Sequence, residues 1–500
     1  MTSPRRRFLI LGLDGGTFDL LDPLMDAGEL PFLKSMVRNG VRAPLTSVYP
    51  AKTIPAWYSF ATGQDPGQLG IYGFTEPTDE PGTSRIVQTF RPAEAMWDQL
   101  SRKGVKVGVV NFPLGAGYPI HGFVMPGMFS AHPVTYPLSL GAEVEDTLGA
   151  PYPPELPIHR ESDRAHWLEL ATQTVMQRGR SAAALAERYR PEFLFTLFRE
   201  TDRVEHQYWS ELARPVSEIP ADLLRFWRAV DAACREVDTA FRSSGGPAVT
   251  LVVSDHGHGE NRSDFFTNRW LIEEGLLVLR EGKDVGGRNL LARMILWSQQ
   301  RGLGRLLAKP VADFLREGKA EGFARLLNGA GSFEQMAERI DWRRTVAYSY
   351  PVPEGIYLNL RNPDLTPERR TAVLNEIRRR LESYSDARIE VLEPERLYHG
   401  HPFGRAPSLL IRVDQMRTEP RMDFSYPMPL IRERPEFFYG CGNHRMDGIL
   451  IGAGDGVRAG ADAGPLSLLD IAPTVLEGMG LPAPASMTGR SFGRRLGLAA

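Results

Sequence analysis

Three acidic residues stand where apolar stretches of the chain end. Asp14 closes the stretch LILGLD, Asp202 follows FLFTLFRET, and Asp255 closes LVVSD. A single acidic residue at such a place can be a helix cap or a turn former. The carboxyl ends of parallel strands, however, meet at one edge of a sheet, where functional side chains of α/β proteins collect. The recurrence therefore predicts that the three carboxylates lie together.

Histidines accompany two of these acidic residues. Asp202 and His206 are four residues apart in TDRVEHQYW, which on a helix places both side chains on one face. Asp255 and His256 are adjacent in LVVSDHGHG, which taken alone is either a polar turn or half of a metal site. A further histidine, His444, lies in CGNHRMDG. Together with Asp14, these five residues offer six nitrogen and oxygen ligands. Such a set suits two ions such as Zn²⁺ or Mn²⁺.

Thr53 is a candidate nucleophile for such a pair of ions. It precedes Ile54 and Pro55 and an apolar helical pattern that runs to Thr62. A threonine in this place is commonly just the N-cap of the helix or the residue before it. The start of a helix also offers free N–H groups to a phosphate, and two ions about 4 Å apart can activate a hydroxyl for in-line displacement. Thr53 can therefore attack phosphorus.

The elements that must position these residues alternate along the chain. Amphipathic segments such as 167–186 and 223–241 lie between short apolar runs. Near-continuous hydrophobicity is typical of strands that are buried on both faces. The pattern predicts an α/β fold with a mostly parallel central sheet flanked by helices. The strand-like runs are residues 7–14, 105–112, 192–200, 248–255 and 448–454.

Residues 276–411 depart from this alternation and are predicted to form an inserted α+β lobe, with 1–275 and 412–500 as the catalytic core. The proline-bearing segment 349–355 is expected to be a surface connection. Within the lobe, the sequence predicts a helical part over 289–340, strands at 355–360 and 387–392, and a helix opened by Thr366, Pro367 and Glu368.

Composition restricts the partners. The chain has 59 Lys and Arg against 61 Asp and Glu, with no basic face for a nucleic acid polymer or a membrane surface. Its two cysteines are too few for a disulfide framework. The apolar run after Arg7 stops at Asp14, so it is shorter than the apolar region of about 7–15 residues in an export signal. No apolar run reaches the about 18 residues that a membrane-spanning helix needs. We expect a cytoplasmic protein with a small-molecule partner, and the oligomeric state stays open.

The motifs, taken in order, resemble the alkaline phosphatase superfamily, and in it the nucleotide pyrophosphatase/type I phosphodiesterase branch. The resemblance covers about residues 7–75, 192–275 and 440–495, and it is the order of the motifs that is specific. The motifs are LGLDGGTFD, PAKTIPAW, FATGQDPGQLGIYGF, TDRVEHQYW, VSDHGHG, GNHRMDG and LSLLDIAPTVLEGMGLPAPASMTGRS.

This resemblance implies a site for two divalent ions, Zn²⁺ or alternatively Mn²⁺, with Thr53 between them. It also implies hydrolysis of a phosphate ester through a covalent phosphothreonine. The first ion is assigned to Asp14, Thr53, Asp255 and His256. The second ion is assigned to Asp202, His206 and His444, with Thr53 as the bridge.

One position departs from the branch. Nucleotide pyrophosphatases carry an Asn after the GIxG segment, where this chain has Phe74, so the choice between monoesters and diesters stays open. The phosphate oxygens are then stabilised by the Thr53 backbone N–H, by Lys52 or by a residue of the inserted lobe, and Phe74 is a candidate pocket wall. Lys52 is alternatively a solvated loop charge. His258 is a candidate rim residue of the pocket or a solvated turn histidine.

Four alternatives within and outside the superfamily compete with a phosphodiesterase or phosphohydrolase. A phosphonate hydrolase would reuse the same metal core. Sulfatases use a modified Cys or Ser, and phosphomutases typically use Ser, so Thr53 argues against both. A non-catalytic metal-binding scaffold would fold normally and turn nothing over, which separates it from the enzymes.

Overall fold

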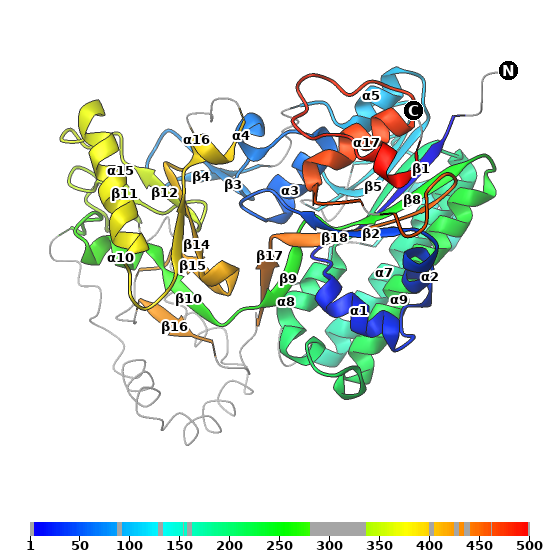
Figure 1. Ribbon diagram of the computed structural model, residues 1–500, viewed down its shortest axis with the longest axis horizontal. Coiled ribbons are helices and arrows are strands. Elements are labelled where there is room, and N and C mark those ends of the chain that lie inside the picture. Colours follow the sequence, from blue (N-terminus) through cyan, green and yellow to red (C-terminus); the bar gives the residue numbers. More distant parts are fainter. Residues whose placement is uncertain are drawn as a thin grey trace.

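The computed structural model describes residues 5–87, 93–128, 134–153, 155–157, 163–280, 337–399, 405–424, 430–434, 441–461 and 463–498. A central sheet with helices on both faces forms one part of the molecule, and a second sheet with its own helices forms the other (Figure 1). The two termini of the described chain lie in the part with the central sheet.

The central sheet has eight strands in the order β19-β2-β18-β8-β1-β7-β5-β6. Strands β8, β1, β7, β5 and β6 are parallel to one another, whereas β18 is antiparallel to both β2 and β8. The mostly parallel sheet and all five predicted strands are thus confirmed. The bounds are β1 Arg7–Leu13, β2 Val41–Thr46, β5 Val107–Pro113, β6 Gly122–Gly127, β7 Phe193–Phe198, β8 Ala248–Val253, β18 Asp447–Gly454 and β19 Leu466–Ser467.

Helices cover both faces because alternate residues of each strand point to opposite sides. In β1, Leu9, Leu11 and Leu13 pack with α1, α2, α7 and α9, whereas Phe8 and Ile10 pack with α3, α5 and α17 on the other face (Figure 1). The predicted amphipathic segments are the long helices α7 and α9. The bounds are α1 Phe18–Asp26, α2 Pro31–Asn39, α3 Thr53–Thr62, α5 Met96–Arg102, α7 Arg164–Tyr189, α9 Ala221–Ser243 and α17 Ile471–Gly478.

A second sheet, in the order β11-β12-β14-β15-β10-β16 with β13 beside β14, encloses a separate apolar core. The predicted strands at 355–360 and 387–392 and the helix that begins at Pro367 are confirmed. The bounds are β10 Ser263–Phe266, β11 Ala347–Tyr348, β12 Gly355–Leu358, β13 Ile389–Leu392, β14 Leu409–Val413, β15 Thr418–Arg421, β16 Ile431–Glu433, α10 Thr267–Glu273, α15 Pro367–Glu382 and α16 Pro394–Leu397.

This sheet takes β10, β15 and β16 from outside residues 276–411, so the division into a core and an inserted lobe stays a prediction. Most of the helical part expected over 289–340 lies outside the described residues. Smaller elements complete the chain: α4 Pro66–Leu69, β3 Thr75–Pro77, β4 Ser84–Ile86, α6 Leu140–Leu148 and α18 Gly493–Leu496.

The segment 349–355 is not the surface connection that its prolines suggested. Ser349 and Val352 are buried, and Tyr350 packs in one apolar cluster with Tyr49 and Tyr72 of the N-terminal part. Proline marks irregular backbone, which is usually but not necessarily exposed. The segment joins the two parts of the molecule, and this prediction was wrong.

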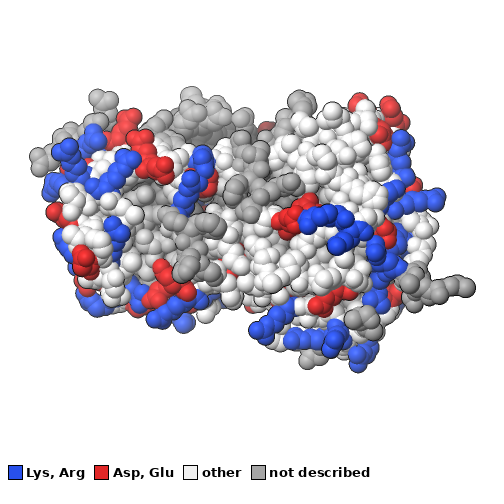
Figure 2. Space-filling model, turned by 90° about the horizontal axis from the view of Figure 1, so that it is seen from above, with Lys and Arg blue, Asp and Glu red and all other residues white. Residues whose placement is uncertain are grey.

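The surface carries charges of both signs. Lys and Arg side chains lie among Asp and Glu side chains toward both ends of the face shown in Figure 2, in line with the balanced composition. Within the described part of the chain, no helix is long and apolar enough to cross a bilayer. Cys234 and Cys441 are both buried free thiols.

Candidate metal centre and nucleophile

Two neighbouring parallel strands bring Asp14 and Asp255 together. Gly12 of β1 pairs with Val253 of β8, so the two strands end at the same edge of the sheet. The Gly15 N–H donates to Asp255 Oδ1 at 3.2 Å. Nε2 of His256 lies 3.7 Å from Asp14 Oδ1 and 3.2 Å from Asp255 Oδ2. All three ligand candidates are fully buried, and we call them the first ligand group.

A second ligand group combines helix α8, Glu200–Leu212, with strand β17, Gly442–Arg445. Asp202 and His206 lie one turn apart on α8, as predicted, and β17 delivers His444 by pairing with β9, Gly257–Glu260. Asp202 Oδ1 is 3.2 Å from His206 Nε2 and 3.3 Å from His444 Nε2. The rings of His444 and His256 stack with centroids 3.8 Å apart, so the two groups adjoin.

Backbone carbonyls fix the direction of the three imidazoles. The Nδ1 atoms of His206, His444 and His256 lie 3.0, 2.6 and 3.0 Å from the backbone oxygens of Gly442, Ala51 and Gly257. When Nδ1–H donates to a carbonyl, the Nε2 lone pair is left for an ion. The three Nε2 atoms face the carboxylates of the two groups, as metal ligands require.

The buried atoms that face one another lack partners. Among the described residues, Asp14 Oδ1, Asp202 Oδ1, Asp255 Oδ2 and His256 Nε2 have no hydrogen bond. Burial raises the pKa of Asp14 to about 8 and that of Asp255 well above its usual range, and neighbouring carboxylates add to both shifts. Divalent cations would supply the missing partners and neutralise this charge, so the oxygen and imidazole donors fit such ions.

Thr53 is the first residue of α3, and it is almost fully buried. Within the described residues no side chain caps this helix start, so its first N–H groups are available to an anion. Hydrogen bonds tie the helix start to both ligand groups: His444 Nδ1 contacts the Ala51 oxygen, and Trp57 Nε1 donates to Asp14 Oδ2 at 3.1 Å. The start of α3, whose first residue is Thr53, is therefore attached to both ligand groups.

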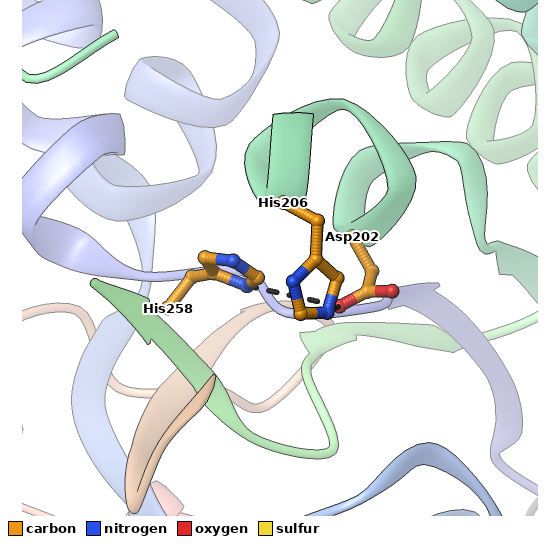
Figure 3. A group of neighbouring side chains, drawn as sticks. All are labelled: Asp202, His206 and His258. Atoms are coloured by element: carbon orange, nitrogen blue, oxygen red, sulfur yellow. Dashed lines mark ion pairs between the residues drawn. The ribbon is translucent and has the colours of Figure 1, made fainter. Parts of the chain in front are cut away.

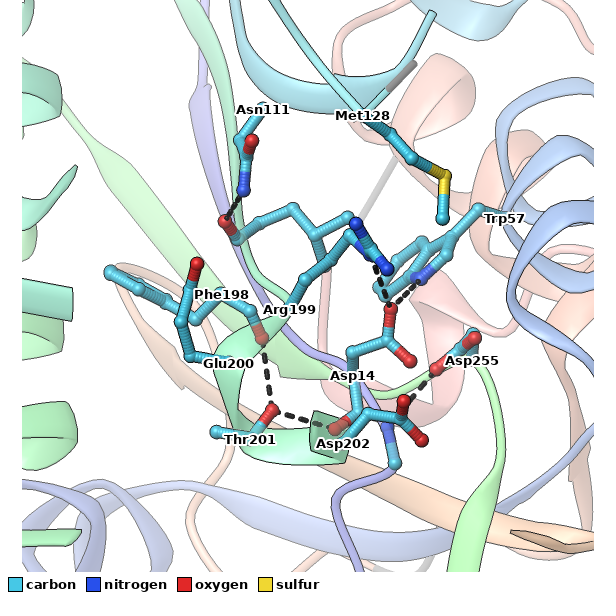
Figure 4. A network of polar contacts seen from close by, with 12 residues as sticks. Asp14, Trp57, Asn111, Met128, Phe198, Arg199, Glu200, Thr201, Asp202 and Asp255 are labelled. Carbon is cyan, nitrogen blue, oxygen red and sulfur yellow. Dashed lines mark hydrogen bonds and ion pairs between the residues drawn. The ribbon is translucent and has the colours of Figure 1, made fainter. Parts of the chain in front are cut away.

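Behind Asp14 lies a contact that the sequence did not suggest. Arg199 Nε is 4.0 Å from Asp14 Oδ2 and Arg199 Nη1 is 2.5 Å from Glu155 Oε2, while the Thr201 hydroxyl donates to the Asp14 backbone oxygen (Figure 4). Arg199 and Trp57 both approach Oδ2, which leaves Oδ1 of Asp14 facing His256. An Arg that ends a buried strand carries no periodic signal, and so it was missed.

A second arginine anchors the start of α8. Arg178 is buried on α7 and donates through Nε to Glu200 Oε1 at 2.8 Å. Its Nη1 donates to Asn111 Oδ1 at 3.0 Å and to the Tyr152 hydroxyl at 2.9 Å. Glu200 is the first residue of α8, so this contact fixes the helix turn that carries Asp202.

The substrate-binding candidates have different settings. Lys52 Nζ forms an ion pair of 2.9 Å with Glu354 Oε1, and both side chains are largely buried, so Lys52 is not a solvated loop charge. His258 is fully buried in β9, which excludes a solvated turn histidine. Phe74 is 39% exposed just before β3, and its role stays a prediction. Glu354 was missed because it lies in the segment expected at the surface.

The sheet, its two helical layers and the ligands at the strand ends define an alkaline phosphatase-like fold. Residues 8–427 match the family described as Type I phosphodiesterase / nucleotide pyrophosphatase, and the chain belongs to this family. Its members are metal-dependent, and the protein is a hydrolase of phosphoric esters. The match ends before His444, whose assignment rests on the geometry above and on the resemblance of its motif.

Solved structures share this fold at low sequence identity. Phosphonoacetate hydrolase from Sinorhizobium meliloti 1021, in complex with phosphonoacetate, is 16% identical, with 94% of each chain covered and a TM-score of 0.54. Human ectonucleotide pyrophosphatase / phosphodiesterase 5 is 13% identical, covering 98% of this chain and 99% of its own, with a TM-score of 0.53.

A mutant of alkaline phosphatase PafA is 14% identical, covering 99% of this chain and all of its own, with a TM-score of 0.57. No curated protein matches the sequence. Identities this low show the shared fold, and what each of these proteins binds remains a property of that protein.

Proposed function

We propose that the protein hydrolyses small-molecule phosphate esters in two steps, with Thr53 as the nucleophile between two divalent ions, Zn²⁺ or Mn²⁺. The observation that carries the proposal is the double attachment of the α3 start, through Ala51 to the second ligand group and through Trp57 to the first. The two free, buried cysteines agree with a cytoplasmic location, which remains part of the proposal.

The bound ions would lower the pKa of the Thr53 hydroxyl and stabilise negative charge on the phosphoryl oxygens. Thr53 Oγ then forms a bond to phosphorus while the bond to the ester oxygen breaks, and the alcohol leaves with a proton. Water attacks the phosphothreonine in the second step and restores the hydroxyl. The uncapped N–H groups at the start of α3 donate to the phosphoryl oxygens through both steps.

The charge around Thr53 favours a diester over a monoester. Lys52, the cation next to the nucleophile in sequence, is already paired with Glu354. Glu419 is ionised as well: burial raises its pKa, but Arg421, Arg434 and Lys52 outweigh this and lower the pKa to about 2, and Arg434 pairs with it at 2.7 Å. A diester carries one negative charge and a monoester two near neutral pH, so the pairing of Lys52 with Glu354 disfavours the monoester more strongly.

The test is a substrate panel of bis-p-nitrophenyl phosphate, p-nitrophenyl phosphate and a phosphonate monoester. We expect the diester to be hydrolysed fastest, EDTA to abolish turnover, and Zn²⁺ or Mn²⁺ to restore it. Preference for the phosphonate would favour the phosphonate hydrolase, whose fold the chain shares. If the metal-loaded protein turns over none of the three substrates, the proposal is wrong and the scaffold alternative stands.

The nucleophile is tested separately with Thr53→Ala and Thr53→Ser. Removal of a covalent nucleophile costs about 10⁴-fold or more in kcat, so Thr53→Ala should be nearly inactive with its metal content unchanged. Thr53→Ser keeps a hydroxyl at the same place and should retain measurable turnover. Full activity in Thr53→Ala would remove Thr53 from the mechanism.

A further inference from the structure

Glu205 is a buried carboxylate that none of the assigned metal sites uses. It lies on α8 next to the ligand His206 and is fully buried. Neither of its oxygens has a hydrogen-bond partner within the described residues. A buried carboxylate without partners costs several kcal/mol of stability, so this position calls for a cation.

His258 faces Glu205 from strand β9. Its ring is fully buried, and neither ring nitrogen has a hydrogen bond in the described part of the chain. His258 Nδ1 lies 3.6 Å from Glu205 Oε2 and 3.7 Å from Asp202 Oδ1. Figure 3 shows the His258 ring directed at the Asp202 carboxylate, beside His206. Both carboxylate oxygens therefore lie within 3.7 Å of one point, the His258 Nδ1 atom.

The spacing is that of ligands which share an ion. A direct hydrogen bond between a carboxylate and an imidazole would measure about 2.7–2.9 Å. Two ligands each about 2.0–2.2 Å from one ion, with an angle of about 90–120° between them, lie roughly 2.8–3.8 Å apart. The first ligand group shows the same signature, since His256 Nε2 is 3.2 and 3.7 Å from Asp255 and Asp14 and these atoms also lack hydrogen bonds in the described structure.

Gly15 keeps the space beside this point open. Its φ of +74° favours glycine, and a Cβ placed there would lie 2.7 Å from Glu205 Oε2 and 3.2 Å from His258 Nδ1. At Gly442, on the other side of the imidazole, a Cβ would lie 2.4 Å from the Glu205 backbone oxygen and 2.7 Å from His258 Nε2. Two glycines therefore border the pair where any other residue would fill the gap.

We propose that Glu205, His258 and Asp202 bind a third divalent cation, with the Asp202 carboxylate shared between this ion and the one held by His206 and His444. Two carboxylates and one imidazole suit Mn²⁺ or Zn²⁺. The third ion neutralises the charge between Glu205 and Asp202 and holds Asp202 in position for the second ligand group. The inference rests on the proposed function only through this shared carboxylate.

The test counts metal ions in the purified full-length protein after loading with Mn²⁺ or Zn²⁺ and desalting, by inductively coupled plasma mass spectrometry. We expect three equivalents in the parent and two in both Glu205→Gln and His258→Phe. Glu205→Gln keeps the shape of the side chain, and His258→Phe keeps a ring against Trp209. Glu211→Gln, on the same helix but paired with Arg164, is the control and should keep three.

Anomalous diffraction from crystals of the Zn²⁺-loaded parent gives a second measurement that needs no variant to fold. A peak between Glu205 and His258, beside two others, supports the third ion. Two equivalents in the parent, or three that survive Glu205→Gln, would overturn it. Failure of the proposed function would look different, because Thr53→Ala would stay active or no ester would be hydrolysed whatever the metal count.

Discussion

Two buried polar clusters adjoin at Asp14, and they balance their charges in different ways. In the arginine cluster, guanidinium and carboxylate groups form contacts as short as 2.5 and 2.8 Å. In the ligand cluster, the carboxylate oxygens lie 3.2–3.7 Å from imidazole nitrogens. The arginine cluster comprises Arg178, Arg199, Glu155 and Glu200. The ligand cluster comprises Asp14, Asp202, Asp255, His206, His256 and His444.

The difference shows how structural burial of charge can be told from a binding site. Burial alone does not separate the clusters, since Arg178 and Glu200 are as inaccessible as Asp14. The clusters differ in the source of the positive charge that neutralises their carboxylates, which is either an arginine side chain or a bound ion. Close contacts between guanidinium and carboxylate groups mean that the chain has provided the cations of the arginine cluster, although Glu200 Oε2 has no hydrogen bond among the described residues. The open distances between carboxylates and imidazoles in the ligand cluster indicate cations bound from outside.

The largest effect is expected where an outside cation loses a ligand. His206→Ala should lower the metal content by one equivalent and kcat/KM by about 10³-fold or more, because several kcal/mol of charge stabilisation are lost. Metal analysis and diester hydrolysis measure both. Retention of every ion in this variant would break the comparison, because His206 would then not be a ligand.

Arg178→Met attacks the other cluster. It leaves Glu200 buried without its cation, so the free energy of unfolding should fall by about 3–5 kcal/mol, with the metal content of the folded protein unchanged. Urea denaturation gives the first value and metal analysis the second. Arg188→Met is the control, because its pair with Glu143 lies at the surface and is worth about 1 kcal/mol or less. Loss of metal in folded Arg178→Met would show that the arginine cluster is required for metal binding, which contradicts the distinction between the two clusters.

Trp57→Phe tests Asp14, the residue at which the arginine cluster and the ligand cluster adjoin, and a smaller effect on metal binding is expected. The indole N–H holds Asp14 Oδ2, and the loss of such an orienting hydrogen bond weakens metal binding by about 10–100-fold. A competition titration with a chromophoric chelator measures this. Trp97→Phe removes an indole that donates to Tyr118 instead, and should leave metal affinity unchanged. Equal affinities in both variants would contradict the orienting role.

Glu354→Gln gives the smallest effect and extends the comparison to an ion pair beside the nucleophile. Releasing Lys52 should raise the ratio of kcat/KM for p-nitrophenyl phosphate over bis-p-nitrophenyl phosphate, by up to about 5-fold, the value of a pair worth about 1 kcal/mol. Glu390→Gln removes a pair with Arg412 on β14 and should leave the ratio unchanged. An unchanged ratio in Glu354→Gln would mean that Lys52 does not sense substrate charge.

The buried parallel strands were predictable because their hydrophobicity is continuous. Strand β2 was missed, although its residues alternate between buried and exposed, because it includes Pro44 and a proline argues against a strand inside a sheet. The direction of β18 could not be known either, because antiparallel and parallel buried strands have the same composition. The resemblance of the ordered motifs, more than local pattern, identified the fold and family correctly.

The site was predictable where a residue type recurs at strand ends or at helical spacing. Asp14, Asp202 and Asp255 follow the first rule and His206 the second, whereas His444 depended on the resemblance of its motif. Glu205 carried no signal, because a glutamate on a helix is usually a surface charge. Its burial arises only when α8 packs against β9 and β17, which no local pattern predicts.

The pairing of β17 with β9 determines when the site can be completed during synthesis of the chain. His444 and His258 lie opposite each other in this small sheet, although more than a third of the sequence separates them. At about 5–20 residues per second, a ribosome needs roughly 10–40 s to synthesise the intervening stretch of about 190 residues. Until β17 emerges, the nascent chain holds the carboxylates of the site without His444, so the second ligand group is complete only after β17 has been translated.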